Sequence, residues 1–356
     1  MKKKKEIVPL LLDWYRRSRR DLPWRQTDDP YRVWVSEIIL QQTRVAQGTA
    51  YYLRFLERFP DVESLAAASP DEVLKVWEGL GYYSRARNMH AAARHIAGRL
   101  GGHFPRTYEE LLRLKGVGPY TAAAVASIAF GEAVPVVDGN VFRVVTRLFA
   151  IALPRGDGGD REVRALLAQL IPAEEAGDFN QALMELGALV CAPADPACDD
   201  CPLQEHCLAR KKNMTGSLPV ATPSRGTKKR YFHYLVAECR GEMLVSQRAG
   251  KDIWQLLWEF PSLETEKEEP PARVLALFEE WLPGITGRGD GEISHLLRHQ
   301  LTHRTILARF YHVTLPQWPA SLKGTFVKTP VNRLEDLAFP RLITRYMEAF
   351  PERFGH

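Results

Sequence analysis

The sequence lacks any apolar run long enough to cross a membrane, although 45% of its 356 residues are hydrophobic. The first apolar stretch, residues 7–12, is too short for the core of a signal peptide, and Asp13 and two arginine pairs follow it. We therefore expect a cytoplasmic protein without a membrane partner. Disulfides are rare in that reducing compartment, so the 5 cysteines of the chain require another explanation.

The sequence also lacks a strong excess of either charge, because its net charge is only +5. Basic residues are nevertheless clustered, at positions 2–5, 16–20, 210–212 and 228–230. Clusters of this kind are typical of proteins that bind polyanions. Any single cluster is explained equally well by a solvated charged surface.

The pattern of apolar residues divides the chain into two domains, which its length allows. Residues 1–212 are helical in pattern: Pro30 follows the potential cap Asp29, and apolar residues then recur at helical spacing. Residues 213–229 have the composition of a linker stiffened by proline. Within residues 230–356 apolar residues recur at every second position, as in strands. A hairpin is expected at Arg240-Gly241 and a helix at 272–282. We predict an all-α domain followed by an α+β domain.

Four of the cysteines lie in one short segment, 191–207, with the spacing C-x6-C-x2-C-x5-C. They are Cys191, Cys198, Cys201 and Cys207. Four thiolates this close suit a tetrahedral metal ion or a cubane iron–sulfur cluster. Zinc sites more often use two C-x2-C pairs, and only one pair occurs here, but spacing alone leaves iron and zinc open. Cys239 lies apart in a predicted strand and is most simply a buried free thiol.

Two glycines, Gly116 and Gly118, separate an amphipathic helical pattern from an alanine-rich one. Glycine lets the backbone approach a phosphate closely, and the helix that follows presents free N–H groups to it. This arrangement predicts a helix–hairpin–helix that grips a DNA backbone without reading its sequence. A tight packing turn would use the same glycines.

Two carboxyl groups are candidates for acid–base chemistry. Asp138 precedes a helical pattern, where aspartate is most often a cap, but the helix dipole would also keep it ionised to face a developing cation. Glu37 lies within a predicted helix at residues 31–43 among apolar residues, so it either faces solvent or has a raised pKa. One protonated and one ionised carboxyl form the pair used to break glycosidic bonds.

Together these features resemble the endonuclease III superfamily of DNA glycosylases and, within it, the A/G-specific adenine glycosylase (MutY) family. The resemblance covers most of residues 8–208. It is carried by Leu22-Pro23-Trp24-Arg25, Trp34-Val35-Ser36-Glu37, Leu40-Gln41-Gln42-Thr43, Gly79-Leu80-Gly81-Tyr82-Tyr83, Asp138-Gly139-Asn140 and residues 179–188. It implies excision of adenine mispaired with 8-oxoguanine or guanine in duplex DNA, a [4Fe-4S] cluster on the four cysteines, and a monomer associated with the nucleoid.

The resemblance also implies roles for individual residues. Glu37 would protonate adenine N7, and Asp138, supported by Asn140, would stabilise the oxocarbenium-like sugar. Tyr120 would lie beside the sugar, where strand-cleaving relatives carry a lysine that forms a Schiff base. The adenine pocket would consist of Trp24, Arg25, Leu40, Val45 and Glu185, with Gln42 and Tyr82 as wedges. Ordinary packing is the alternative for each of them.

Residues 231–350 resemble the Nudix-like domain of the same family, with residues 254–261 as the lead-in to a Nudix motif. The acidic helix that holds magnesium is missing, since Pro270 and Pro271 intervene and only Glu279 and Glu280 follow. We therefore expect no nucleotide pyrophosphatase activity. The family reads the lesion through a loop of aromatic-Ser-His type, and its counterpart here is Leu301-Thr302-His303. A strand-surface position is the alternative for Thr302 and His303.

Two other functions fit part of the sequence. A pyrimidine-damage glycosylase with lyase activity would share the fold, but Tyr120, Glu37 and the second domain argue against it. A non-catalytic DNA-binding protein with a structural iron–sulfur cluster would not need an acid at Glu37 together with Asp138.

Overall fold

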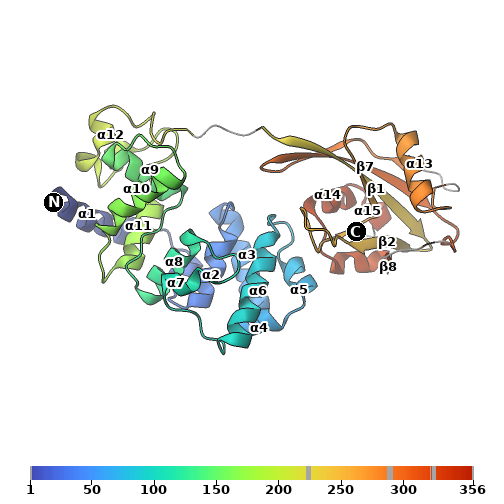
Figure 1. Ribbon diagram of the computed structural model, residues 1–356, viewed down its shortest axis with the longest axis horizontal. Helices are drawn as coiled ribbons and strands as arrows, with labels where there is room; N and C mark the ends of the chain where they lie inside the picture. Colours follow the sequence, from blue (N-terminus) through green and yellow to red (C-terminus); the bar gives the residue numbers. More distant parts are fainter. Residues whose placement is uncertain (1, 222–225, 287–291, 321, 323–325, 355–356) are drawn as a thin grey trace. The chain divides into compact units, whose positions relative to one another are not determined.

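The computed structural model describes residues 2–221, 226–286, 292–320, 322 and 326–354. Contacts divide the chain into two compact units. The helical unit comprises Met1–Ala67 and Asn88–Pro223, and the sheet unit comprises Ala68–Arg87 and Ser224–His356 (Figure 1). The segment Ala68–Arg87 therefore packs with the sheet, whereas the sequence pattern groups it with the helices. Of the linker predicted at residues 213–229, residues 222–225 lie outside the described residues.

The helical unit consists of helices joined by short connections. Its elements are α1 (Lys2–Ser18), η1 (Pro23–Arg25), α2 (Pro30–Ile39), α3 (Val45–Arg58), α4 (Val62–Ala67), α6 (Ser84–Arg99, which begins in the sheet unit), α7 (Tyr108–Leu111), α8 (Pro119–Phe130), α9 (Gly139–Phe149), α10 (Asp157–Ala168), α11 (Ala176–Leu189), η2 (Cys198–Asp200), η3 (Gln204–His206) and α12 (Leu208–Lys211). No helix in the described part of the chain is long and apolar enough to span a membrane.

Helix α8 lies between α2 and α11 because its side chains are small. Residues 121–127 of α8 are buried, and four of them are alanine. On α11, Gly177 makes a similarly close approach, since a Cβ there would lie 2.9 Å from the carbonyl oxygen of Ser127. Close packing of small residues fixes the helices tightly. The start of α8, the middle of α2 and the start of α9 are thereby held as parts of one rigid core.

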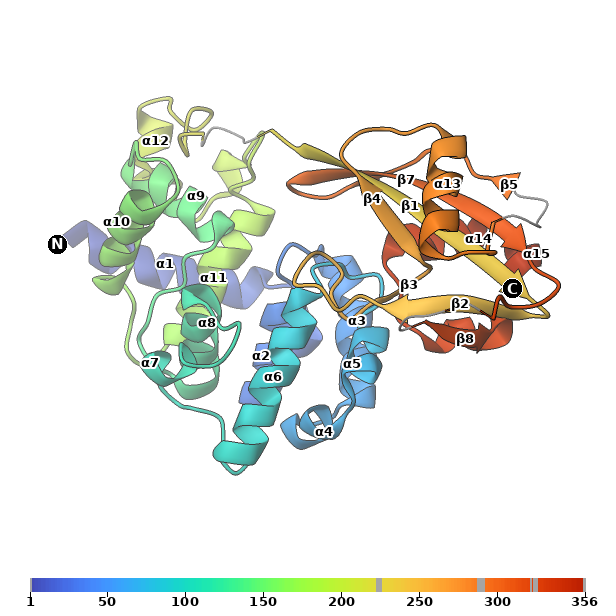
Figure 2. The same ribbon diagram turned by 45° about the vertical axis from the view of Figure 1, so that its right-hand side comes forward.

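The sheet unit is built on a long parallel pair of strands, β1 (Lys228–Cys239) and β7 (Arg304–Thr314), seen side by side in Figures 1 and 2. The remaining elements are α5 (Pro70–Val76), β2 (Glu242–Gln247), β3 (Trp258–Glu259), β4 (Ser262–Thr265), α13 (Pro271–Trp281), β5 (Glu292–Ile293), β6 (Leu297–Gln300), β8 (Val327–Pro330), η4 (Val331–Asp336), α14 (Arg341–Ala349) and α15 (Pro351–Phe354). The strand order is β3-β2-β1-β7-β5, with β4 on β1, β6 on β7 and β8 on β2.

Helices cover both faces of this sheet. On one face Tyr311 of β7 packs edge-on against Phe278 of α13, with ring centroids 5.9 Å apart. On the other face Phe310 stacks on Tyr346 of α14 at 3.8 Å. The predicted hairpin joins β1 to β2, and its two turn residues, Arg240 and Gly241, have φ of 53° and 76°, as the tightest hairpin turns require. The predicted all-α and α+β classes are confirmed.

Candidate active site

Glu37 is buried in the middle of helix α2. The helix starts as predicted, because Asp29 caps it by accepting the Tyr31 N–H at 2.8 Å. Glu37 is only 6% exposed, and its Oε2 has no hydrogen-bond partner among the described residues. Burial raises the pKa of Glu37 to about 7, because the charged form is poorly solvated. A large fraction of Glu37 is therefore protonated at neutral pH.

The charged and polar neighbours of Glu37 come from three other elements. The Asp138 carboxyl raises the pKa of Glu37 further, whereas the Tyr120 hydroxyl and the Arg25 guanidinium lower it. Residues 25, 37, 120 and 138 are separated widely in sequence, so the fold brings them within electrostatic reach of each other. The site thus combines a protonated carboxyl group with a second acid.

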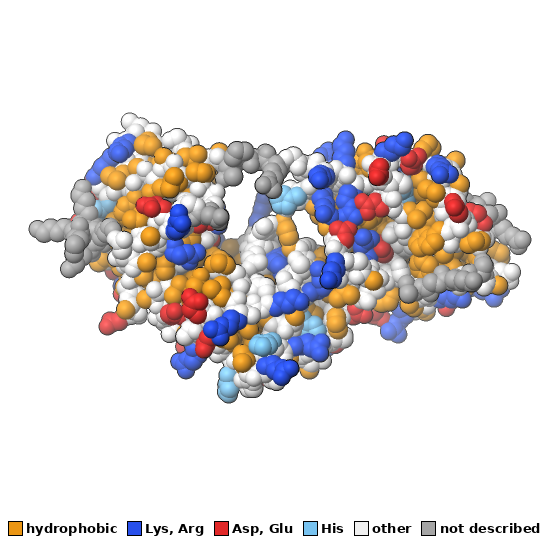
Figure 3. All heavy atoms as spheres, viewed as in Figure 1, with side chains coloured by type: hydrophobic (Ala, Val, Ile, Leu, Met, Phe, Trp, Pro, Cys, Tyr) orange, Lys and Arg blue, Asp and Glu red, His pale blue; other side chains and the backbone are white. Residues whose placement is uncertain are grey.

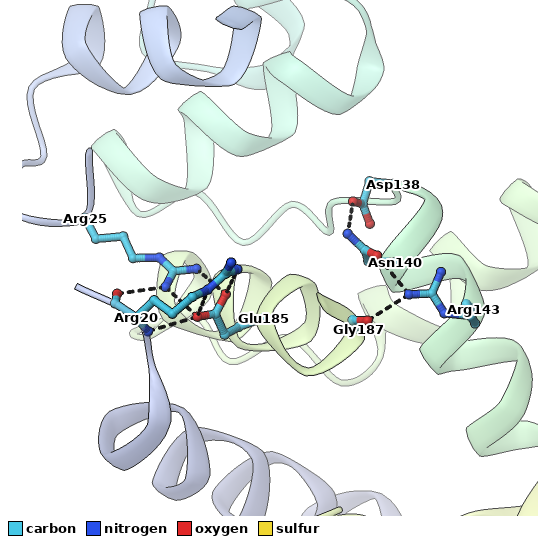
Figure 4. Close-up of polar contacts among 7 residues, drawn as sticks. All are labelled: Arg20, Arg25, Asp138, Asn140, Arg143, Glu185 and Gly187. Carbon is cyan, nitrogen blue, oxygen red and sulfur yellow. Dashed lines mark hydrogen bonds and ion pairs between the residues drawn. The ribbon is translucent and has the colours of Figure 1, made fainter. Parts of the chain in front are cut away.

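Asp138 caps helix α9, as one of its two interpretations predicts. Its Oδ1 accepts the Val141 N–H at 2.7 Å, and its Oδ2 accepts the Asn140 side-chain amide at 3.2 Å (Figure 4). Burial raises the pKa of Asp138, while the Val141 N–H, Arg155 and Asn140 oppose that rise by stabilising the carboxylate. Asp138 therefore keeps donors on both oxygens, whereas Glu37 has an oxygen with none.

Tyr120 lies in the first turn of α8 beside Glu37. Burial raises the pKa of Tyr120 well above its usual value, and Glu37 and Asp138 raise it further, so the phenol keeps its proton. Its hydroxyl donates a hydrogen bond to Met184 Sδ of α11 at 3.4 Å. A protonated phenol cannot form a Schiff base.

Arg25 is held by Glu185 of α11 (Figure 4). Its two terminal nitrogens each donate to one oxygen of Glu185 at 2.8 Å, and Arg20 donates to the same carboxylate from its Nε and Nη2 at 2.9 and 2.6 Å. Burial alone would raise the pKa of Glu185, but the hydrogen bonds from Arg25 and Arg20 lower it to about 2. Both oxygens of Glu185 are occupied, so this carboxylate fixes the position of Arg25.

Arg143 connects the start of α9 to the cysteine segment. Its Nη2 donates to Asn140 Oδ1 at 2.9 Å and to the Gly187 carbonyl at 2.8 Å (Figure 4). Its Nε donates to the Cys191 carbonyl at 2.7 Å. One turn later the buried Arg147 donates from Nη1 to Cys191 Sγ at 3.4 Å. Asp138 and the first cysteine are thus joined through a short chain of hydrogen bonds.

The four clustered cysteines line a common cavity in the helical unit. Burial raises the pKa of the Cys201 thiol to about 11, and the neighbouring thiols raise it further. Thiolates here therefore need a positive partner, as a metal centre provides. Within the described residues no group of three or more His, Cys, Asp or Glu side chains is arranged around a single metal ion. The four cysteines that line this cavity are nevertheless the candidate ligands for the predicted metal centre.

The hairpin glycines occupy the turn between α7 and α8. Gly116 has φ of 79°, and a Cβ there would lie 2.5 Å from the Cβ of Asn88, so both conformation and space require glycine. Gly118 is the N-cap of α8 and has open space beside it. The turn leaves the first N–H groups of α8 available to an anion.

Of the predicted pocket and wedge residues, Leu40, Gln42 and Val45 lie between the end of α2 and the start of α3. Helix α2 ends at Ile39, earlier than predicted, because Leu40 caps it and Gln42 turns into the left-handed region with φ of 56°. Gln42 is exposed, and Val45 begins α3. Trp24 is buried and meets Tyr52 edge-on at 5.4 Å. Gln42 is therefore placed on a tight exposed turn, and Trp24 in the core.

The sheet unit contains a separate cavity of about 520 Å³. Its lining includes Tyr82, Trp254, Thr302, His303 and Arg304. Tyr82 is 44% exposed, has φ of 47° and contacts Thr302 through a hydroxyl–hydroxyl hydrogen bond. A predicted wedge and a predicted lesion-reading residue therefore meet at one cavity.

Arginines anchor the strands beside this cavity. Asp252 accepts from Arg230 at 2.6 Å and from Arg304 at 2.9 Å. Burial opposes ionisation of Asp252, but hydrogen bonds from these arginines lower its pKa well below the usual range. Basic and acidic side chains are intermixed on the face of the sheet unit that Figure 3 shows. The paired arginines fix the start of β7, which follows Thr302 and His303.

Sequence reasoning missed Arg20, Arg143, Arg147 and Met184. A signal exists for two of them, since Arg143 and Arg147 lie one turn apart on the buried face of a short amphipathic helix. Arginines at such positions need partners inside the protein. Arg20 is marked only as part of a basic cluster and Met184 only as part of the segment 179–188, so the sequence does not indicate the contacts that either residue makes.

Comparison with known proteins agrees with this geometry. Residues 35–173 match the HhH-GPD superfamily of base excision DNA repair proteins, and residues 233–349 match the NUDIX domain. A solved structure of a trapped endonuclease III–DNA covalent intermediate is similar to the chain with 26% identity and a TM-score of 0.51, covering 59% of this chain and 98% of that one. These matches place the chain among the DNA glycosylases of base excision repair.

Two curated relatives narrow the class. The adenine DNA glycosylase of Mus musculus is 37% identical, over 87% of this chain and 71% of that protein. The adenine DNA glycosylase of Buchnera aphidicola subsp. Schizaphis graminum is 33% identical, over 96% of this chain and 97% of that protein. The chain belongs to the adenine DNA glycosylase family, and the predicted superfamily is confirmed.

Proposed function

We propose that this glycosylase acts as a monomer on duplex DNA. It hydrolyses the N-glycosidic bond between deoxyribose and an adenine that is mispaired with 8-oxoguanine or guanine. The observation that carries the proposal is the buried Glu37, whose Oε2 lacks a partner and whose pKa lies at about 7, beside Asp138. A proton donor near the operating pH is well suited to general acid catalysis, which typically contributes ~10²–10⁴-fold.

In the proposed mechanism the extruded adenine takes the proton of Glu37 at N7, which makes the base a better leaving group. Asp138, held by Asn140 and the Val141 N–H, stabilises the positive charge that develops on the sugar. Water completes the hydrolysis. We assign adenine binding to Trp24, Leu40 and Val45 together with Arg25, which Glu185 holds in place.

Tyr120 supports a hydrolase without lyase activity, because a tyrosine stands where an amine nucleophile would be needed. A borohydride trap distinguishes this proposal from the pyrimidine-damage alternative. We expect no covalent capture on DNA with an A:8-oxoguanine pair, and strong capture on damaged-pyrimidine DNA would favour the alternative.

We further propose that the sheet-unit cavity reads the partner base through Thr302 and His303, with Tyr82 and Gln42 as wedges. Extruding a base costs a few kcal/mol, which wedging side chains offset. The hydroxyl contact between Tyr82 and Thr302 supports this assignment because it couples the wedge to the reading loop.

The four cysteines fit a [4Fe-4S] cluster, and we propose that Cys191, Cys198, Cys201 and Cys207 bind it. When bound, the cluster supplies positive charge that stabilises the thiolates and cross-links the segment between them. In this chain Arg143 donates a hydrogen bond to the carbonyl of Cys191, and Arg147 donates one to its sulfur.

The most informative experiment measures single-turnover base release from three duplexes that differ only in the partner of one adenine. We expect release opposite 8-oxoguanine to be fastest, release opposite guanine slower, and release opposite thymine undetectable. Thr302→Val should reduce the preference for 8-oxoguanine over guanine, and Ser84→Ala, at the rim of the same cavity, serves as the control. Equal rates for all three duplexes would contradict the proposed substrate.

A further inference from the structure

The hydroxyl of Tyr120 has two possible partners and only one proton to donate. It interacts with the Glu37 carboxyl through a hydrogen bond that lowers the pKa of Glu37, and it also donates to Met184 Sδ at 3.4 Å. Tyr120 and Met184 also pack together at the edge of the small alanine cluster that contains Ala123, Ala124 and Val136. The thioether of α11 is therefore a fixed feature of the phenol's environment.

We propose that Met184 is a positioning residue for the acid: by competing for the Tyr120 proton, it weakens the hydrogen bond from the phenol to Glu37. This inference rests on the proposed role of Glu37 as proton donor. A phenol that donates to a carboxylate stabilises the charged form and lowers the pKa of the carboxyl group. A smaller fraction of the acid is then protonated at neutral pH. While the phenol donates its hydrogen bond to Met184, its oxygen can accept a hydrogen bond from the protonated carboxyl group of Glu37.

Three neighbouring side chains shift the pKa of Glu37 in addition to burial, so the contribution of Tyr120 can be measured apart from the other two. They are Arg25 of η1, Tyr120 of α8 and Asp138 at the start of α9. Glu185 of α11 acts only through Arg25, since Arg25 and Arg20 occupy both of its oxygens. Substitution of Met184 alters none of these three groups chemically and removes the acceptor that competes for the phenol proton. A thioether is a weak acceptor, and leucine of similar volume has none.

The test is the pH profile of single-turnover adenine release for the wild type and Met184→Leu on an A:8-oxoguanine duplex. Glu37 must be protonated to act, so the rate falls as pH rises through its pKa. We expect the falling limb of Met184→Leu to move down by roughly 0.5–1 pH unit, giving a loss of about 3- to 9-fold at pH 8 but of less than about 2-fold at pH 6. Met184→Gln, whose amide oxygen can accept from the phenol, should keep the limb near its wild-type position.

A double-mutant cycle separates positioning from packing. In a Tyr120→Phe background there is no phenol proton to redirect, so Met184→Leu should leave the pH profile unshifted. The proposal is overturned if Met184→Leu lowers the rate by the same factor at every pH, or if its shift persists with Phe at 120. A failure of the proposed function is seen separately, because Glu37→Gln would then release adenine as fast as the wild type.

Discussion

The guanidinium of Arg143 donates to Asn140 Oδ1 at 2.9 Å, and Asn140 in turn donates from its amide to Asp138 Oδ2 at 3.2 Å. The same guanidinium binds the carbonyls of Gly187 and Cys191. One cation thus organises the start of α9, the end of α11 and the beginning of the cysteine segment. Arg143 therefore supports Asp138 through the side chain of Asn140.

Replacing Arg143 should weaken both the fold and base release. In Arg143→Met, the Gly187 and Cys191 carbonyls and the Asn140 oxygen lose a charged donor, and such bonds contribute about 1.5–3 kcal/mol each. We expect the free energy of unfolding to fall by at least ~2 kcal/mol and the single-turnover rate to fall with it. Urea unfolding and base-release assays measure the two effects. Arg161→Met, on the exposed side of α10, should change neither.

Removing the Glu185 carboxylate should destabilise the protein in a pH-dependent manner. Its pKa of about 2 lies below the ordinary value of ~4.3, so its stabilisation is complete above pH ~4.3 and is lost as pH falls towards 2. We expect Glu185→Gln to cost about 3 kcal/mol at pH 7 and progressively less below pH 4. Chemical unfolding across this range measures the difference.

The matched control is Glu175→Gln at the start of the same helix. Glu175 forms an ion pair with Arg16, and both side chains are largely exposed, at 41% and 50%. An exposed pair contributes only ~0–1 kcal/mol. Equal losses for Glu175→Gln and Glu185→Gln would show that burial of the Arg20–Glu185–Arg25 cluster is not what stabilises the fold.

The raised pKa of Glu37 should lower stability at alkaline pH. A buried carboxyl with a pKa of about 7 favours folding while protonated, and that contribution is lost as pH rises through 7. Glu37→Gln removes the titration, so we expect the variant to exceed the wild type in stability at pH 8.5 by up to ~3 kcal/mol but not at pH 5. Thermal unfolding of both proteins at pH 5 and pH 8.5 checks this prediction. A stability difference that is the same at both pH values would contradict a raised pKa for the buried Glu37 carboxyl.

The sheet unit should not hydrolyse nucleotides. Glu279, one of only two acids near the end of α13, is already used: its Oε1 accepts the Gly284 N–H at 2.6 Å and its Oε2 accepts the Thr286 N–H at 3.0 Å. A pyrophosphatase needs several free carboxylates for magnesium. Incubation with magnesium and oxidised dGTP should release no monophosphate, and enzyme-like turnover would refute the prediction.

Local features of the fold follow from the sequence, whereas long-range partners do not. The Asp29 cap and the Arg240-Gly241 turn depend on residues within four positions of each other, so the sequence pattern predicts them. The packing of Ala68–Arg87 with the sheet depends on contacts such as that of Glu78 with the Phe339 N–H, 261 residues away. Periodicity carries no information about such contacts.

The same distinction applies to the site. The apolar surroundings of Glu37 in the sequence allow either a solvent-facing side chain or a raised pKa, and the structure shows a buried side chain with a raised pKa. The full occupation of Glu185 by Arg20 could not be expected, since 165 residues separate the two and Arg20 also fits a solvated basic cluster. The roles of the site residues in catalysis stay predictions.

The account depends on proton transfer from Glu37, and Glu37→Gln tests it most directly. Glutamine keeps the size of the side chain but cannot donate a titratable proton. Single-turnover adenine release from an A:8-oxoguanine duplex should fall by at least ~10²-fold, while affinity for the same duplex stays near that of the wild type. Release at close to the wild-type rate, with DNA binding intact, would contradict the mechanism.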